Sequence, residues 1–214
     1  MNTWRSWLRE STKEAPLGHE VDSVSVSQRT GVGKLADLLS RRLRIEALRT
    51  SHAEEVVSAL QSPELFTYLP EEPPTVEALE QRYAFLEKGS SPDGQALWLN
   101  WVAFLHDAVT PVATFQATLP KGKAASIAYL VFPSFWRQGY AREMATRVID
   151  HLFEVYAIPS LYAEIDTRNM GSIRLAESLG LTRIKTTQGD DVFKGASSDE
   201  YTYALSREDW SSWA

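Results

Sequence analysis

Three strand-like runs follow one another in the middle of this chain, and the connections between them are short. Strand-forming residues dominate 96–105, 112–119 and 125–132. Turn-forming residues at 107–111 and 120–123 separate these runs. A parallel crossover needs about a dozen residues or more, so connections of this length favour antiparallel pairing. The centre of the fold is therefore predicted to be an antiparallel meander that ends at Pro133.

The segments around the meander alternate between helical and strand patterns. An amphipathic helix is predicted over 140–156, where Met144, Val148 and Leu152 share one face. Further helices are predicted near 50–60, 75–89 and 169–180, and further strands near 42–48, 161–166, 181–187 and 201–205. We interpret residues 1–40 as an N-terminal extension, flexible or oligomer-forming, with a short helix at 36–42. Residues 41–214 form the predicted domain.

The composition narrows the classes of function. A net charge of −6 over 214 residues argues against a nucleic-acid-binding surface. The absence of cysteine excludes disulfides, thiolate metal sites and cysteine nucleophiles. The four histidines are scattered without ligand spacing, so no metal site is predicted. No run approaches membrane-spanning length and the first residues lack a signal-peptide core, so we expect no membrane association and a cytoplasmic location.

The strongest functional signal lies between the third strand of the meander and the long helix. It reads Phe135-Trp136-Arg137-Gln138-Gly139-Tyr140-Ala141-Arg142-Glu143. Glycine lets the main chain approach a ligand closely, and the first N–H groups of a helix have no partner within it. With Arg137 beside them, these groups predict a site for an anion such as a phosphate-bearing cofactor. A turn that binds nothing is the alternative interpretation.

Residues 131–143 resemble the acetyl-CoA-binding segment of the GNAT N-acetyltransferases. Trp136 is at the start of the six-residue loop, and a tryptophan at this position resembles the branch that contains the ribosomal-protein N-terminal acetyltransferases. Four further motifs also resemble that branch and occur in the expected order along the chain. The resemblance covers about residues 42–205. The four motifs are Tyr68-Leu69-Pro70, Asn169-Met170-Gly171-Ser172, Gly180-Leu181, and Asp199 four residues before Tyr203.

The resemblance implies an α+β GNAT fold, with a mixed, mostly antiparallel sheet flanked by helices. It implies acetyl-CoA as co-substrate, bound where the strand ending at Phe132 and the strand beginning at Leu161 splay apart. The main chain of Gln138, Gly139, Tyr140, Ala141 and Arg142, with the charge of Arg137, would bind the pyrophosphate. Leu130, Val131 and Phe132 would give main-chain hydrogen bonds to the pantetheine arm, and Asn169 would bind the same arm.

The catalytic residues follow the family pattern less closely. Many members have a tyrosine acid seven residues after the asparagine position, where this chain has Ala176. In the branch that this chain resembles, a serine at this position can face the sulfur, so we assign that role to Ser172; a first-turn helix residue bonded to the main chain is the alternative. No carboxylate lies at 127–132, so Asp199, Glu164 and Asp166 are the candidate bases, with Asp199 assigned here. A base acting through water is equally compatible.

The expected activity is direct transfer of an acetyl group from acetyl-CoA to a primary amine. A protein or peptide N-terminus is the favoured acceptor, and a small amine is the second candidate. The alternative function is a non-catalytic acyl-CoA-binding regulatory module. A homodimer formed through the N-terminal extension is also compatible with the sequence.

Overall fold

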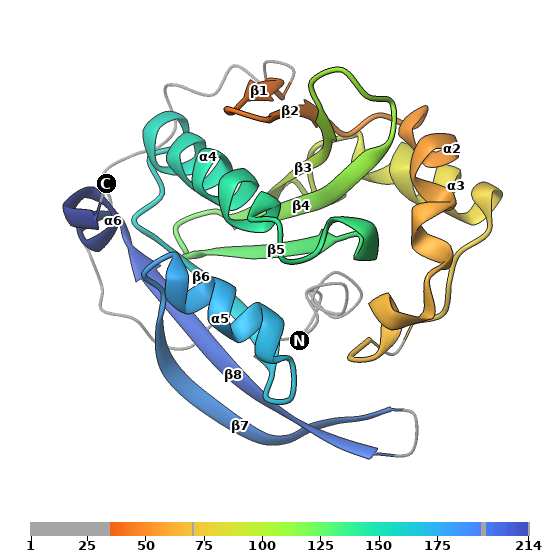
Figure 1. The fold of residues 1–214 in the computed structure, drawn as a ribbon. Coiled ribbons are helices and arrows are strands. Elements are labelled where there is room, and N and C mark those ends of the chain that lie inside the picture. The colour runs from red at the N-terminus through yellow and green to blue at the C-terminus, as the bar shows by residue number, and fades with distance from the viewer. Residues whose placement is uncertain (1–34, 70, 194–195, 214) are drawn as a thin grey trace.

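One eight-stranded sheet forms the centre of the computed structural model, which describes residues 35–69, 71–193 and 196–213. The strand order is β1-β2-β3-β4-β5-β6-β8-β7 (Figure 1). Neighbouring strands are antiparallel except β5 and β6, which are parallel. The strands are β1 (Leu38–Leu39), β2 (Leu43–Ala47), β3 (Ala96–Leu105), β4 (Pro111–Pro120), β5 (Ala125–Val131), β6 (Ser160–Asp166), β7 (Thr182–Phe193) and β8 (Ala196–Ser206).

The helices lie on both faces of this sheet (Figure 1). They are α2 (His52–Val57), α3 (Val76–Leu86), α4 (Tyr140–Val155), α5 (Met170–Ser178) and α6 (Arg207–Trp213), with short 3-10 turns η2 (Ala59–Gln61), η3 (Pro63–Phe66) and η4 (Pro133–Phe135). The prediction of a mixed, mostly antiparallel sheet flanked by helices is confirmed. Among the described residues, no helix is long and apolar enough to cross a membrane.

Alternation along the central strands produces two separate hydrophobic cores. On β3, Trp101 packs in the core beneath α4 and α5, whereas Trp98 and Phe104 pack beneath α2 and α3. Met144 and Leu152 of α4 are fully buried in the first core. Burying side chains of this size contributes about 1.5–3 kcal/mol each. This packing sets α4 across the sheet, so that its first residue follows closely on the end of β5.

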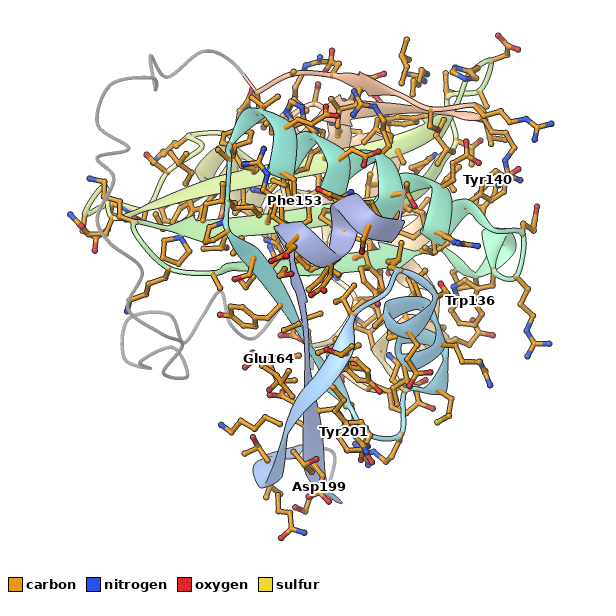
Figure 2. All side chains as sticks on the ribbon, turned by 90° about the vertical axis from the view of Figure 1, so that its left-hand side faces the viewer. Trp136, Tyr140, Phe153, Glu164, Asp199 and Tyr201 are labelled. Carbon is orange, nitrogen blue, oxygen red and sulfur yellow. The ribbon has the colours of Figure 1, made fainter. Side chains whose placement is uncertain are left out.

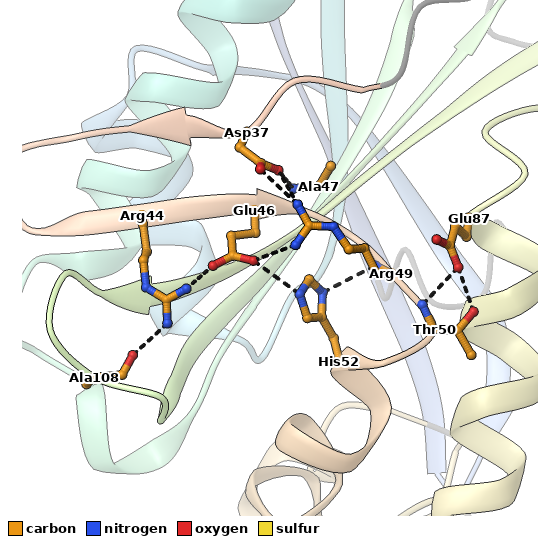
Figure 3. Close-up of polar contacts among 9 residues, drawn as sticks. All are labelled: Asp37, Arg44, Glu46, Ala47, Arg49, Thr50, His52, Glu87 and Ala108. Carbon is orange, nitrogen blue, oxygen red and sulfur yellow. Dashed lines mark hydrogen bonds and ion pairs between the residues drawn. The ribbon is translucent and has the colours of Figure 1, made fainter.

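A polar network joins β2 to the first two helices (Figure 3). Arg49 donates to Asp37 (2.8 Å) and to Glu46 (2.9 Å). The buried His52 accepts from the main-chain N–H of Arg49 at Nδ1 (3.2 Å), and its Nε2 lies 3.4 Å from Glu46. Burial lowers the pKa of His52 and outweighs the opposing effect of Glu55. The histidine is therefore held neutral as part of the scaffold.

The first and last elements of the described chain differ from prediction. Leu38 and Leu39 form strand β1 instead of the helix predicted at 36–42, and they pair with Ile45 and Arg44. Leu38 is buried in the first core, a contact with a distant element that local pattern does not reveal. Helix α6 was not predicted, although Ser206 caps it by accepting from Asp209 N (3.0 Å). The greater part of the expected extension, residues 1–34, lies outside the described residues.

Candidate active site

Strands β5 and β6 separate soon after they pair. Parallel pairing is limited to Ala125 with Leu161 and Ser126 with Tyr162. Beyond these pairs lies a cleft of about 960 Å³, at the place expected for the cofactor. Residues 127–131 of β5 and 163–166 of β6 all line it. Because successive strand residues point to opposite faces, a cleft lined by consecutive residues passes through the sheet from one face to the other.

The glycine loop forms one end of the cleft. Gly139 has a φ of 81° and Arg137 a φ of 58°, both left-handed. This conformation costs a non-glycine residue about 1–2 kcal/mol, and such strain is common at binding sites. No described residue accepts a hydrogen bond from the main-chain N–H of Gly139, Tyr140 or Ala141. The loop therefore presents a row of unpaired donors at the start of α4.

Most of the predicted loop residues reach the cleft. Arg137, Gly139, Tyr140, Ala141 and Arg142 line it, whereas Gln138 does not. The side chain of Gln138 instead turns back and donates to the carbonyl of Ser134 (2.9 Å). Trp136 also lines the cleft and donates through Nε1 to the carbonyl of Val131 (2.6 Å). Figure 2 shows Trp136 and Tyr140 at the same edge of the molecule.

The main-chain N–H groups at the end of β5 point alternately toward β4 and toward the cleft. Phe132 N donates to Val112 O of β4 (3.0 Å), and its side chain is buried. Hydrogen-bonding direction alternates along an antiparallel strand, so Leu130 also faces β4, and Val131 and Tyr129 face the cleft. Of the three predicted pantetheine contacts, Leu130 and Val131 line the cleft and Phe132 does not. The available main-chain donors on this wall are therefore those of Val131 and Tyr129.

Helix α5 begins on the opposite wall of the cleft. Asn169 is its N-cap, because its Oδ1 accepts from Ser172 N (3.1 Å). Both residues line the cleft. The Tyr129 hydroxyl donates to Ser172 O (3.2 Å), which joins β5 to α5 across the opening. No described residue hydrogen-bonds the Ser172 hydroxyl, which is half-buried beside the cleft.

The three candidate bases have different surroundings. Asp166 is 1% exposed and accepts from Arg168 Nη2 and from Ser198 Oγ, both at 2.6 Å. Burial raises the pKa of this carboxyl, but the bonds from Arg168 and Ser198 hold it below its ordinary value. Asp199 accepts from Gly189 N (2.8 Å) and is not among the cleft residues, and Figure 2 shows it far from Trp136 and Tyr140. Glu164 is half-buried and lines the cleft.

The charged residues that line the cleft include one more base than acid, although the chain is acidic overall. Four arginines line it, namely Arg137, Arg142, Arg168 and Arg174, against the carboxylates of Glu64, Glu164 and Asp166. Arg168 pairs with Asp166, and the excess of arginines over carboxylates favours an anionic ligand. Within the described part of the chain, no group of three or more His, Asp or Glu side chains is placed to hold a metal ion.

Two contributors to this site were not predicted. Tyr129 lies in a strand that reads as purely structural, and only its polar hydroxyl within a buried run distinguishes it. Arg168 was also missed, although an Asp-x-Arg sequence before a helix cap could have indicated it. The cleft is also lined by Tyr68 and Leu69 of the predicted Tyr68-Leu69-Pro70 motif, whose proline lies outside the described residues.

Comparison with known proteins identifies the family of this chain. The sequence pattern of the acetyltransferase (GNAT) domain matches residues 42–182. An FsC-acetyl coenzyme A-N(2)-transacetylase of Aspergillus fumigatus is 33% identical over 84 residues, which cover 38% of this chain and only 36% of that protein. An N-acetyltransferase of Bacillus subtilis, YoaA, is 24% identical over 66% of this chain and 80% of its own length.

Solved structures share the fold. A GNAT-family acetyltransferase from Bacillus anthracis has a TM-score of 0.69 at 20% identity, covering 81% of this chain and 99% of that one. The ribosomal-protein-S5-alanine acetyltransferase of Vibrio fischeri has a TM-score of 0.68 at 17% identity (82% and 98%). The spermidine N-acetyltransferase of Vibrio cholerae, solved with CoA and spermine, has a TM-score of 0.67 at 16% identity (79% and 98%). Since the family pattern covers the greater part of the sequence, the chain belongs to the GNAT family of acetyl-CoA-dependent N-acetyltransferases.

Proposed function

We propose that this protein transfers an acetyl group from acetyl-CoA to the α-amine of a protein or peptide N-terminus, with a small amine as the second candidate acceptor. The observation that carries the proposal is the cleft through the sheet. It joins the unpaired N–H groups beside Gly139 to Ser172 and Glu164 within one continuous opening. An anionic carrier and a reacting amine can therefore meet inside the sheet.

The described residues fit acetyl-CoA, which supplies an acetyl group activated as a thioester. The N–H groups of Gly139, Tyr140 and Ala141, with Arg137 and Arg142, would bind its pyrophosphate. Val131 and Tyr129 would hydrogen-bond the pantetheine arm as an added strand would, because β6 has already diverged. Asn169 keeps its amide N–H groups for the same arm, since its Oδ1 is used in capping α5.

The side chains in the cleft can manage the protons of the transfer. As the new C–N bond forms and the C–S bond breaks, Glu164 would accept the proton that the amine loses. Ser172 would donate a hydrogen bond to the departing sulfur, which leaves as a thiolate and takes its proton from water. A main-chain N–H of Val131 or Tyr129 would stabilise negative charge on the acetyl oxygen. We do not extend a role to Asp199, because it is outside the cleft.

The choice of acceptor rests on the charge of the cleft. Four arginines and three carboxylates line the cleft, so it disfavours a polyamine, which carries several positive charges. A singly charged α-amine is disfavoured less, and Glu164 lies in the cleft, where it would accept the proton of the amine. The solved structures with this fold include enzymes named for a ribosomal-protein acceptor and for spermidine, so both acceptor classes are accessible to the fold.

A panel of acceptors tests the proposal. Acetyl-CoA is mixed with peptides bearing a free N-terminal alanine or serine, with N-terminally blocked lysine peptides, with free amino acids and with spermidine. Thiol release and product mass are then measured. Acetylation of the free α-amines is expected to dominate. Preference for spermidine would refute the assigned acceptor, and acetyl-CoA binding by calorimetry without turnover of any amine would favour the regulatory module.

A further inference from the structure

Arg42 lies against the glycine loop although it is far away in sequence. It precedes β2, and its Nη1 donates to the carbonyl of Gln138 (3.0 Å). Its Nε donates to Glu143 Oε2 (2.6 Å), and its main-chain N–H donates to Glu143 Oε1 (2.6 Å). One residue therefore holds both the loop and the first turn of α4.

The guanidinium lies behind the loop, outside the cleft. Its carbon lies 4.2 Å from the centre of the Tyr140 ring. A Cβ added at Gly139 would lie 3.4 Å from Nη2 of Arg42. Arg42 is not among the residues that line the cleft. It can therefore affect a bound ligand only by setting the position and the charge of the loop.

The charge of Glu143 makes the position of the Arg42 guanidinium important. Glu143 is in the first turn of α4, next to the N–H groups proposed to bind a diphosphate. Burial raises the pKa of its carboxyl, but hydrogen bonds from Arg42 and Ser40 (2.8 Å) hold the pKa below its ordinary value. A charged carboxylate so close to an anion site would repel the anion unless a cation balanced it.

We propose that Arg42 is a positioning residue for the pyrophosphate of acetyl-CoA. It fixes the backbone of the loop through the Gln138 carbonyl and balances the charge of Glu143, so the N–H groups after Gly139 stay directed at the anion. This inference rests on the proposed binding of acetyl-CoA at the loop. It assigns a role to a residue 96 positions before the carbonyl that it holds.

The test compares two acetyl donors, acetyl-CoA and S-acetylpantetheine, which lacks the pyrophosphate. In Arg42→Met we expect kcat/KM for acetyl-CoA to fall about 10- to 100-fold, the range of a lost charge-assisted contact. We expect kcat/KM for S-acetylpantetheine to stay the same. Arg42→Lys, which keeps the charge, should recover part of the loss. An equal loss with both donors, or no loss with either, would overturn the proposal.

Arg44→Met is the matched control, because Arg44 lies in β2, two residues after Arg42, and contacts Ala108 O (2.7 Å) and the Phe104 ring instead of the loop. It should leave both donors unaffected. Adding Glu143→Gln to Arg42→Met should restore part of the CoA affinity measured by calorimetry, and further loss would contradict charge balancing. If the wild-type protein used both donors equally well, the proposed pyrophosphate site itself would be wrong, independently of Arg42.

Discussion

Replacing Asp166 tests whether this carboxylate supports the site or takes part in proton transfer. Asp166 accepts from Arg168 Nε (2.9 Å), Nη2 (2.6 Å) and main-chain N (2.8 Å), and from Ser198 Oγ (2.6 Å). These contacts shape the turn that leads into the Asn169 cap. Asp166→Ala removes them all, and Asp166→Asn keeps one oxygen acceptor.

The structure sets the expected size of the effect. Ser198 is only 7% exposed, so its hydroxyl would lose a buried acceptor at a cost of about 1–3 kcal/mol. The Arg168 side chain is 43% exposed, so water can replace much of its contact and the loss is about 1 kcal/mol or less. The free energy of unfolding should fall by about 1–4 kcal/mol in Asp166→Ala. For a chain of this size, that lowers Tm by roughly 2–16 °C.

Thermal unfolding and steady-state kinetics separate the two roles. The matched variant is Glu164→Gln, two residues earlier on the same strand and therefore on the same face. We expect it to lower kcat about 100-fold or more, as for loss of a general base. Asp166→Asn should lower Tm and change kcat much less. The reasoning fails if Asp166→Asn abolishes turnover at unchanged Tm, or if Glu164→Gln keeps full kcat.

Three further predictions concern the loop, the helix cap and the scaffold. Gly139→Asp should weaken acetyl-CoA binding, measured by calorimetry, at least about 10-fold, because it adds negative charge beside the loop and draws Arg42 away from Glu143. The neutral Gly139→Asn should weaken binding less. Equal affinities of the two variants for acetyl-CoA would contradict the anion site. Ser172→Ala should lower kcat with little change in acetyl-CoA affinity, whereas unchanged kcat would leave Ser172 only its main-chain role in α5. Because the pKa of His52 is lowered in the folded state, the unfolded chain binds the extra proton first. Stability measured by urea should therefore fall as pH drops below about 6.5, by at most about 1.4 kcal/mol per pH unit until the folded-state pKa is reached. His52→Gln should remove this slope, and an identical slope in that variant would exclude His52 as its source.

The parts of the fold that depend on local pattern were predictable from sequence. Turn lengths predicted the meander, and the apolar periodicity of α4 predicted its span. The glycine loop was predicted from adjacent residues, because a basic residue and a glycine directly precede a helix start. In each case, the residues that predict the feature are close together in the sequence.

Features that depend on distant contacts were not predictable in this way. Strand β1 has only two residues and forms through its pairing with β2. The contacts of Arg42 with Gln138 and Glu143 bring together segments about 100 positions apart. The position of Asp199 depends on the pairing of β7 with β8, which carries its carboxylate to Gly189. Spacing from Tyr203 identifies its strand but not the direction in which the side chain points.

The opening between β5 and β6 also determines whether both substrates can be bound at the same time. A cleft lined by consecutive residues of both strands is open toward both faces of the sheet. Two substrates that enter from opposite faces need not exchange places, so neither product has to leave before the second substrate arrives. Initial-rate plots at several fixed acceptor concentrations should therefore intersect, whereas parallel lines would mean that the protein itself carries the acyl group between two separate half-reactions.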